Sequence, residues 1–267
     1  MNDTSTAGNL LRWPLSGCQA DVDSGGPALL ARPFGQAEDL DVDFRGAPRP
    51  AVITSLLALG IRVPQRERID ESELWNWPVT QRTQGLLAIA VATGGSRRQA
   101  TAQCDNPGCC EWMEIGIDLT MFCVPSQEET FVWQDFELRV PTGEDQMRLA
   151  SGSVTDWLTL ARNLVQKGDP DRLGDVNLQD IETAIAEHDP LTDLSLTASC
   201  PNCGRETEVE FDLEAFLLAE LERRQMGLLK SVHRLALAHH WSEAEILALP
   251  AWRREYYLEL LDQEGEQ

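Results

Sequence analysis

The sequences TAQCDNPGCC (residues 101–110) and TASCPNCG (residues 197–204) are two copies of one pattern, and they decide the predicted fold. The ten positions that follow the later cysteine of each copy align without a gap, so that Glu114 corresponds to Glu208. Apolar and polar residues alternate on both sides of the cysteines, as in LSLTAS and ETEVEFDL, which is the period typical of β-strands. Each copy is therefore predicted to be a strand, a tight cysteine turn and a second strand.

The cysteines of the two turns form a candidate metal site. A C-x2-C turn aims two thiolates at one ion, and two such turns facing each other complete a tetrahedral zinc site with sulfurs about 2.3 Å from the metal. We expect one structural Zn²⁺ per chain, held by Cys104, Cys109, Cys200 and Cys203. A disulfide pair or unrelated free thiols are the alternatives.

The first turn departs from the second in two ways. Its cysteines are separated by four residues instead of two, and Cys110 stands where the second copy has Gly204. Glycine tolerates a left-handed turn best, so Cys110 is either a ligand in its own right or a neighbour of one. The alignment counts from Cys109, which favours Cys109 as the ligand.

The charge of the chain limits the kinds of partner it can have. Its 267 residues include 44 acidic and 22 basic ones, which gives a formal net charge of −22. Such a field repels nucleic acid and anionic lipid, and it favours a basic protein partner. The longest apolar run is also far shorter than the ~20 residues of a membrane span. We therefore expect neither nucleic acid nor a membrane among the partners.

The cysteine content indicates a reducing compartment. Seven cysteines are an odd number, and the first residues lack the charged and apolar pattern of a secretory signal. Thiols of cytosolic proteins stay reduced or bind metal. A cytoplasmic location is the expectation.

The predicted fold class is α+β, with a pseudo-duplicated zinc-ribbon core, flanking helices and a C-terminal helical hairpin. Residues 1–50 are rich in Pro, Gly and Asp and are expected to form an irregular arm. Residues 51–211 would hold the helices and the zinc ribbon, with an insertion at about 124–176. Residues 212–267 would form a long helix and the helical hairpin. Because a helix is expected before each cysteine copy, the repeated unit could be helix, strand, turn and strand.

Capping residues give the expected helix boundaries. Side chains that cap helices stand at Thr80, Ser153, Asn177 and Ser242. After Asp212 the leucines recur every one or two helical turns, which predicts one long amphipathic helix to about His240.

No catalytic motif is present in the sequence. It contains no H-E-x-x-H, G-x-S-x-G, P-loop or G-x-G-x-x-G pattern. Four thiolates would also fill the position that a catalytic zinc keeps open, so an enzyme is not expected. A zinc-ribbon transcription or regulatory protein with a C-terminal helix-turn-helix is the alternative function. Against it, Arg253 and Arg254 are the only basic cluster of that region in a chain of charge −22.

Several stretches in order resemble one family of contractile-tail phage proteins, the T-even-type baseplate hub assembly chaperones. Related genes accompany phage-tail-like contractile injection systems. The resemblance covers roughly residues 70–261 and leaves residues 1–50 uncovered. The first cysteine turn departs from the C-P-x-C-G pattern usual in the family. The similar stretches are ELWNWPVTQRTQGLLA (73–88), FELRVPTGEDQMRLA (136–150), CPNCG (200–204), VHRLA (232–236), WSEAEILALP (241–250) and RREYYLELL (253–261).

The resemblance implies a non-enzymatic assembly factor or minor baseplate component that binds hub or spike proteins. Such a protein would act in the cytoplasm or become part of an assembled tail or injection particle. The expected partner surface is the C-terminal hairpin, around Trp241, Trp252, Tyr256 and Tyr257. These aromatic residues could instead be plain core, an alternative that is stronger for Trp252.

Overall fold

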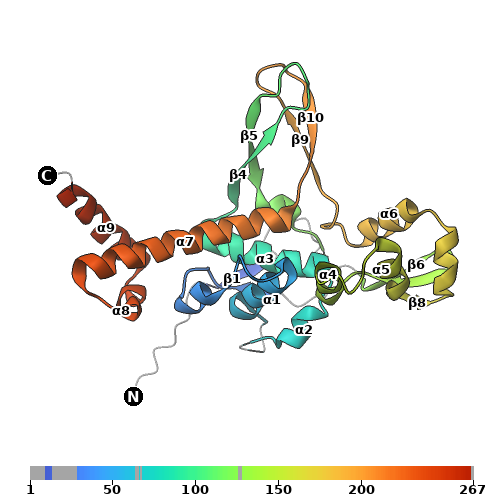
Figure 1. The fold of residues 1–267 in the computed structure, drawn as a ribbon, viewed down its shortest axis with the longest axis horizontal. Coiled ribbons are helices and arrows are strands. Elements are labelled where there is room, and N and C mark those ends of the chain that lie inside the picture. Colours follow the sequence, from blue (N-terminus) through green and yellow to red (C-terminus); the bar gives the residue numbers. More distant parts are fainter. Residues whose placement is uncertain (1–9, 14–28, 64–65, 67, 126–127, 266–267) are drawn as a thin grey trace.

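The computed structural model describes residues 10–13, 29–63, 66, 68–125 and 128–265, and the fold is α+β (Figure 1). A helical body lies at the centre, and two β-hairpins project from it. A small lobe of strands and helices lies at one end, and a helical hairpin lies at the other. All the sheets in the described part are small and antiparallel. None of the described helices combines the length and the apolar character needed to cross a membrane.

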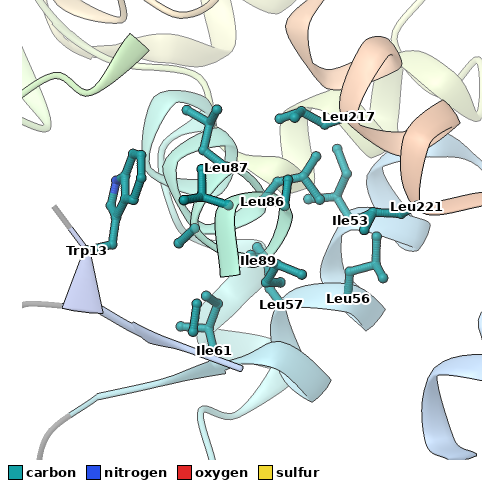
Figure 2. Close-up of a cluster of buried hydrophobic side chains, with 14 of the residues drawn as sticks. Trp13, Ile53, Leu56, Leu57, Ile61, Leu86, Leu87, Ile89, Leu217 and Leu221 are labelled. Atoms are coloured by element: carbon teal, nitrogen blue, oxygen red, sulfur yellow. The ribbon is translucent and has the colours of Figure 1, made fainter. Parts of the chain in front are cut away.

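The centre of the body is the contact between α1 (Arg49–Gly60) and α3 (Val79–Gly94). Both helices are apolar on most of their faces, which is typical of buried helices, and Figure 2 shows their side chains interleaved. Their backbones come close because glycines lie at the contact. A Cβ atom at Gly60 would overlap the side chain of Ile89, and one at Gly85 would overlap a leucine of α1.

The long helix α7 (Leu213–His239) closes this core from above. Leu217 and Leu221 of its first turns are buried against α1 and α3 (Figure 2). One turn further on, Gln225 is buried and its amide Nε2 donates to carbonyl oxygens of residues 39, 40 and 42. These bonds attach α7 to the short helix η1 (Ala37–Asp41).

Residues 1–50 were expected to form an irregular arm, but the described part of this region contains regular structure. It contributes two strands of a three-stranded antiparallel sheet, β1 (Leu11–Trp13) and β2 (Leu29–Ala31), which continues into β3 (Ile61–Arg62). Trp13 is 1% exposed, and its indole N–H donates to Gln84 of α3. Strands of three residues are too short to show a periodic pattern, which is why the sequence did not reveal them. Residues 1–9 and 14–28 lie outside the described residues.

Each cysteine copy is an antiparallel hairpin, as predicted, and the two together are called the cysteine arm below. Thr101 pairs with Glu114 in the first hairpin, and Thr197 pairs with Glu208 in the second. The sequence alignment equates these same positions. The strands are β4 (Arg97–Gln103) and β5 (Trp112–Asp118), then β9 (Ser195–Ser199) and β10 (Glu206–Glu210).

The helices that precede the two hairpins have different surroundings. Helix α3 belongs to the central core, whereas α6 (Leu178–His188) packs in a separate core with Phe131, Phe136 and Leu164. A helix precedes each hairpin, as expected, but the two helices belong to different cores.

The separate core forms the lobe, which spans residues 128–188 apart from α4. Its sheet has the order β6-β7-β8. Its elements are β6 (Thr130–Trp133), β7 (Phe136–Arg139), α5 (Trp157–Leu164), β8 (Val165–Lys167), η3 (Pro170–Asp175) and α6. Short helices complete the central body: α2 (Glu71–Trp75), η2 (Leu119–Phe122) and α4 (Gly143–Ala150).

The C-terminal prediction is confirmed. Asp212 caps α7, which ends where His240 adopts a left-handed conformation with φ 56°. The capping box of Ser242 begins α8 (Glu243–Ala248), and α9 (Ala251–Gly265) turns back along α7. These three helices share a small core around Val232, Leu235 and Ile246.

Two of the four predicted caps differ from the observed ones. Asn177 and Ser242 cap their helices as expected. However, α5 begins after Asp156 rather than Ser153, and α3 begins after Pro78 rather than Thr80. The hydroxyl of Thr80 instead accepts a hydrogen bond from the backbone of Leu191, a contact over 111 residues that no local pattern contains.

Arg82 is a fully buried cation that ties three helices together. Its guanidinium donates to the carbonyl oxygens of Leu74 and Pro50 and to the hydroxyl of Thr54, at 2.7–2.9 Å. Desolvation lowers its pKa to about 10, and Glu214 opposes that shift, so the side chain stays charged at neutral pH. The first residue of α4, Gly143, lies directly against the guanidinium.

Replacing Gly143 with alanine is expected to destabilise the protein by about 1–3 kcal/mol, because the new Cβ overlaps a guanidinium that three hydrogen bonds hold in place. The matched control is Gly227→Ala in α7, where nothing lies within 4 Å of the new Cβ. Alanine is the better helix former by about 1 kcal/mol, so this variant should be more stable. Urea unfolding measures both free energies, and equal changes in the two variants would contradict the close contact.

Two buried carboxyl groups lie near Arg82, where the lobe, α3 and α7 meet. Asp189 is 1% exposed and accepts the backbone N–H of Thr80 at the start of α3, while its Oδ2 has no partner. Desolvation raises the pKa of Asp189 to about 6, against the hydrogen bonds from Thr80. Desolvation also raises the pKa of Glu214, which accepts from Thr83 and Gln146.

The raised pKa of Asp189 predicts a loss of stability with rising pH. The folded state holds the proton up to about pH 6 while the free carboxyl loses it near 3.8, so stability falls across this window as pH rises. Asp189→Asn should therefore be about 1–3 kcal/mol more stable than the wild type at pH 7, with little difference at pH 4. Urea unfolding at both pH values measures this. Asp193→Asn, at an exposed position, is the control, and an unchanged difference between pH 4 and 7 would refute the assignment.

Candidate metal centre

The four predicted cysteines come together at the far end of the cysteine arm. The loops that join β4 to β5 and β9 to β10 lie side by side there, away from the helical body (Figure 1). One ligand atom from each of Cys104, Cys109, Cys200 and Cys203 can be chosen so that all lie within 4.8 Å of one another. Cys104 and Cys200 are buried, whereas Cys203 is exposed.

Backbone hydrogen bonds shape the two turns. Cys104 and Cys200 directly follow the first strand of each hairpin and donate their N–H groups to the carbonyls of Glu111 and Arg205 across the loop. Each turn then needs a residue with positive φ, which is Cys110 (φ 50°) in the first and Gly204 (φ 72°) in the second. These are the two positions that the sequence alignment equates. The left-handed conformation costs a non-glycine residue about 1–2 kcal/mol.

Two of the sulfur–sulfur distances match those of a tetrahedral metal site. Cys104 Sγ lies 3.7 Å from Cys203 Sγ, and Cys109 Sγ lies 3.7 Å from Cys200 Sγ. Four sulfurs at about 2.3 Å from a central ion, in tetrahedral geometry, would be about 3.8 Å apart. A disulfide would need a separation of about 2.05 Å, and these thiols are free. The donor set therefore fits a thiophilic metal ion, and the alternative of a disulfide pair is not what the structure has.

The surroundings of the sulfurs favour the thiolate of Cys203 but the protonated thiol of Cys104. The backbone N–H of Arg205, followed by the side chain of Asn106, lowers the pKa of Cys203 to about 6. The backbone N–H of Asn106 also acts to lower the pKa of Cys104, but desolvation and the neighbouring thiols raise it to about 11. The amide of Asn202 donates to Cys109 Sγ at 3.3 Å. Because metal ligation requires deprotonated sulfur, a bound cation would replace the remaining protons.

A second connection between the two turns was not predicted from the sequence. Asp105, next to the first cysteine, forms an ion pair of 3.0 Å with Arg205 of the second turn. It also accepts a hydrogen bond from Thr207 Oγ1 at 3.2 Å. Both partners are about 100 residues away in the sequence, so only the opposite charges, at the start of the first turn and just after the second, could have indicated the contact.

Cys110 lies outside the sulfur cluster. Its thiol is exposed and lies 3.6 Å from the carbonyl oxygens of Asn106 and Pro107. The sequence left open whether Cys109 or Cys110 is the ligand. The cluster contains Cys109, which is therefore the candidate ligand.

The four aromatic residues predicted to form a partner surface separate into two pairs. Trp241 and Tyr257 are half-buried, pack edge to face at 5.2 Å and contact the small C-terminal core. Trp252 is 68% exposed and Tyr256 is 55% exposed, one turn apart on α9. Together with Leu260 they form an exposed apolar stripe, called the α9 stripe below. Trp252 is thus a surface residue, contrary to the alternative that favoured the core.

In the comparisons with known proteins, no family model, no curated protein and no solved structure matches the chain. Its function has to be inferred from the residues and geometry described above.

Replacing Cys200 with serine is expected to abolish metal binding and to lower the melting temperature by roughly 5–10 °C, since a structural metal contributes directly to folding free energy. Elemental analysis by mass spectrometry gives the metal content, and thermal unfolding gives the melting temperature. Cys110→Ser is the matched control and should keep both values. If Cys110→Ser lost the metal and Cys200→Ser kept it, the assignment of the ligands would be wrong.

Proposed function

We propose that the protein is a non-enzymatic assembly factor or minor structural component of a contractile-tail baseplate, where it binds hub or spike proteins. The cysteine arm carries one structural Zn²⁺ on Cys104, Cys109, Cys200 and Cys203 and is a pseudo-duplicated zinc ribbon. The observation that supports the structural role is the cluster of four sulfurs, all within 4.8 Å of one another and with two pairs 3.7 Å apart.

Zinc is the metal that suits this site best. Tetrahedral sets of four cysteine sulfurs are typical of structural zinc or iron–sulfur sites. Cys104 and Cys109, with Cys200 and Cys203, come from two turns that approach each other face to face, as in zinc ribbons. Four protein ligands leave no position for a substrate, which supports a structural rather than a catalytic ion.

The shared register of the two hairpins supports the pseudo-duplication. Thr101 lies opposite Glu114 and Thr197 opposite Glu208, although the first loop is two residues longer than the second. A length difference within the loop leaves the strand pairing unchanged. This is the pattern expected if one hairpin arose as a copy of the other.

The surface supports a protein partner. Exposed aromatic side chains are enriched in protein interfaces, and the α9 stripe presents two of them beside Leu260. Its place on a helix that extends from the body makes it accessible to a partner (Figure 1). The net charge of −22 favours partners with basic surfaces. The assignment to a baseplate rests on the sequence resemblance, which includes the second cysteine turn and the C-terminal helices, whereas the first cysteine turn departs from the family pattern.

Native mass spectrometry of the tagged protein, purified from its own host, tests the function. We expect co-purification with hub or spike proteins at a mass that includes one zinc. The double variant Trp252→Ala/Tyr256→Ala should reduce partner recovery at least tenfold without changing the melting temperature, because both side chains are exposed. Val132→Ala, which changes a side chain 76% exposed on the lobe, is the control.

The other outcomes decide against the proposal. Recovery with RNA polymerase or with DNA would support a zinc-ribbon regulatory protein. Recovery of the protein alone would contradict the assembly role. Equal partner recovery by the wild type and the double variant would move the binding surface away from the α9 stripe.

A further inference from the structure

Helix α1 borders a groove on the side that faces away from α3. From residue 50 to residue 60 it contains no charged residue, although a helix at the surface normally carries polar residues on its solvent side. Its inner face is buried against α3, as described above. The opposite side lines a groove of about 910 Å³ with Val52, Ser55, Ala58 and Leu59, of which Val52 is buried, Ala58 and Leu59 are half-buried and Ser55 is exposed. The apolar part of this groove is therefore the half-buried pair Ala58 and Leu59.

The groove has two walls and a definite size. Residues 38–47 line one side, and residues 68–71, which lead into α2, line the other. From Val52 to Leu59 the floor extends about 10 Å at 1.5 Å per residue. A space of this length and volume accommodates a short peptide segment and lies in the range of ligand pockets.

The rim of the groove is acidic. Among the described lining residues, five carry carboxylates, Glu38, Asp41, Asp43, Asp70 and Glu71, and one is a cation, Arg68. Two of the five have partners: Glu38 lies 3.7 Å from Arg32, and Asp43 accepts backbone N–H groups of its own turn.

Three carboxylates at the rim form no ion pair within the described part of the chain and outnumber Arg68, the cation that lines the groove. Among the described residues, Asp41, Asp70 and Glu71 have no ion pair or hydrogen bond through their carboxylates. The nearby arginines on this side of the body are already paired, Arg45 with Glu222 and Arg49 with Asp212. An occupant that covers these carboxylates must supply positive charge, because burying an unpaired carboxylate costs several kcal/mol.

This charge distribution excludes several occupants. A second copy of the same face would bring like charges together, and nucleic acid would be repelled. Residues 14–28 of this chain include Asp21 and Asp23 and no lysine or arginine, so they do not complement the rim. A basic segment of another protein remains.

We propose that this groove binds a short basic segment of a partner protein, with one apolar side chain on α1 between Val52 and Leu59 and flanking lysines or arginines against Asp41, Asp70 and Glu71. The site lies on a different helix from the α9 stripe and shares no residue with the cysteine arm. It depends on neither the metal nor the baseplate assignment.

Fluorescence anisotropy on the full metal-loaded chain at 0.15 M salt tests the groove. The probe is a labelled, terminally blocked peptide Lys-Arg-Leu-Ala-Lys-Arg, compared with Lys-Arg-Gly-Ser-Lys-Arg and Glu-Glu-Leu-Ala-Glu-Glu. We expect saturable binding of the first peptide, binding at least fivefold weaker for the second and none for the third. The triple variant Asp41→Asn/Asp70→Asn/Glu71→Gln should weaken binding of the first peptide about tenfold, since each exposed ion pair contributes about 0.2–1 kcal/mol.

The control removes the same charge elsewhere. Glu206→Gln/Glu208→Gln/Glu210→Gln neutralises three exposed glutamates of β10 and should change affinity less than twofold. A second groove variant, Ser55→Arg at an exposed position of α1, should abolish binding by occupying the floor. If the groove triple variant and the β10 variant lost affinity for the first peptide equally, the binding would be general electrostatic attraction, and the proposal would be overturned. Binding by the wild type that does not saturate would also overturn it.

Discussion

A two-stranded hairpin is marginally stable in water, and this molecule projects two of them away from its body. Their shared core is small and consists mainly of Ala102, Met113, Cys104 and Cys200. The contact between the two turns therefore has to stabilise both hairpins at once. It joins segments almost 100 residues apart through four sulfurs and the Asp105–Arg205 ion pair. At the base of the arm, Arg98 of β4 pairs with Glu220 of α7 at 2.6 Å. The two hairpins are thus joined to each other at the far end, and the first hairpin is attached to the body at the base.

Elsewhere, paired charges connect segments that apolar packing alone would leave loose. Arg32 and Asp39 form two hydrogen bonds of 2.8 and 2.7 Å and hold η1 against β2. Arg139 and Asp145 form a similar pair between β7 and α4, at the point where the lobe joins the body. Bidentate geometry fixes orientation as well as distance. Most other carboxylates face solvent, which reconciles a net charge of −22 with an apolar core.

Local patterns in the sequence were enough to predict the hairpins, the four clustered cysteines and the capped C-terminal helices. Strand alternation and the capping of a helix by Ser242 each involve only a few neighbouring residues. The structures they produce can therefore be predicted without knowing the fold. The contact of Trp13 with Gln84 spans 71 residues and could not be predicted in this way. The separate core around α6 was missed for a related reason, because an apolar helix face does not specify which of two cores it enters. The left-handed turn at Cys110 was only partly predictable, from its alignment with Gly204.

Helix α7 sets an angular relation between the two ends of the molecule. Its first turns are fixed in the central core by Leu217 and Leu221, and its last turns are fixed in the C-terminal core by Val232 and Leu235. Each residue of an α-helix advances the direction of a side chain by about 100°. One residue inserted between these two anchored ends would therefore turn α8 and α9 by about 100° around the α7 axis and shift them by about 1.5 Å. The 27-residue length of α7 thus fixes the azimuth at which its C-terminal end presents α9 relative to the cysteine arm. Variants of α7 that differ in length by one residue would therefore differ more in the direction in which α9 points than in its distance from the body.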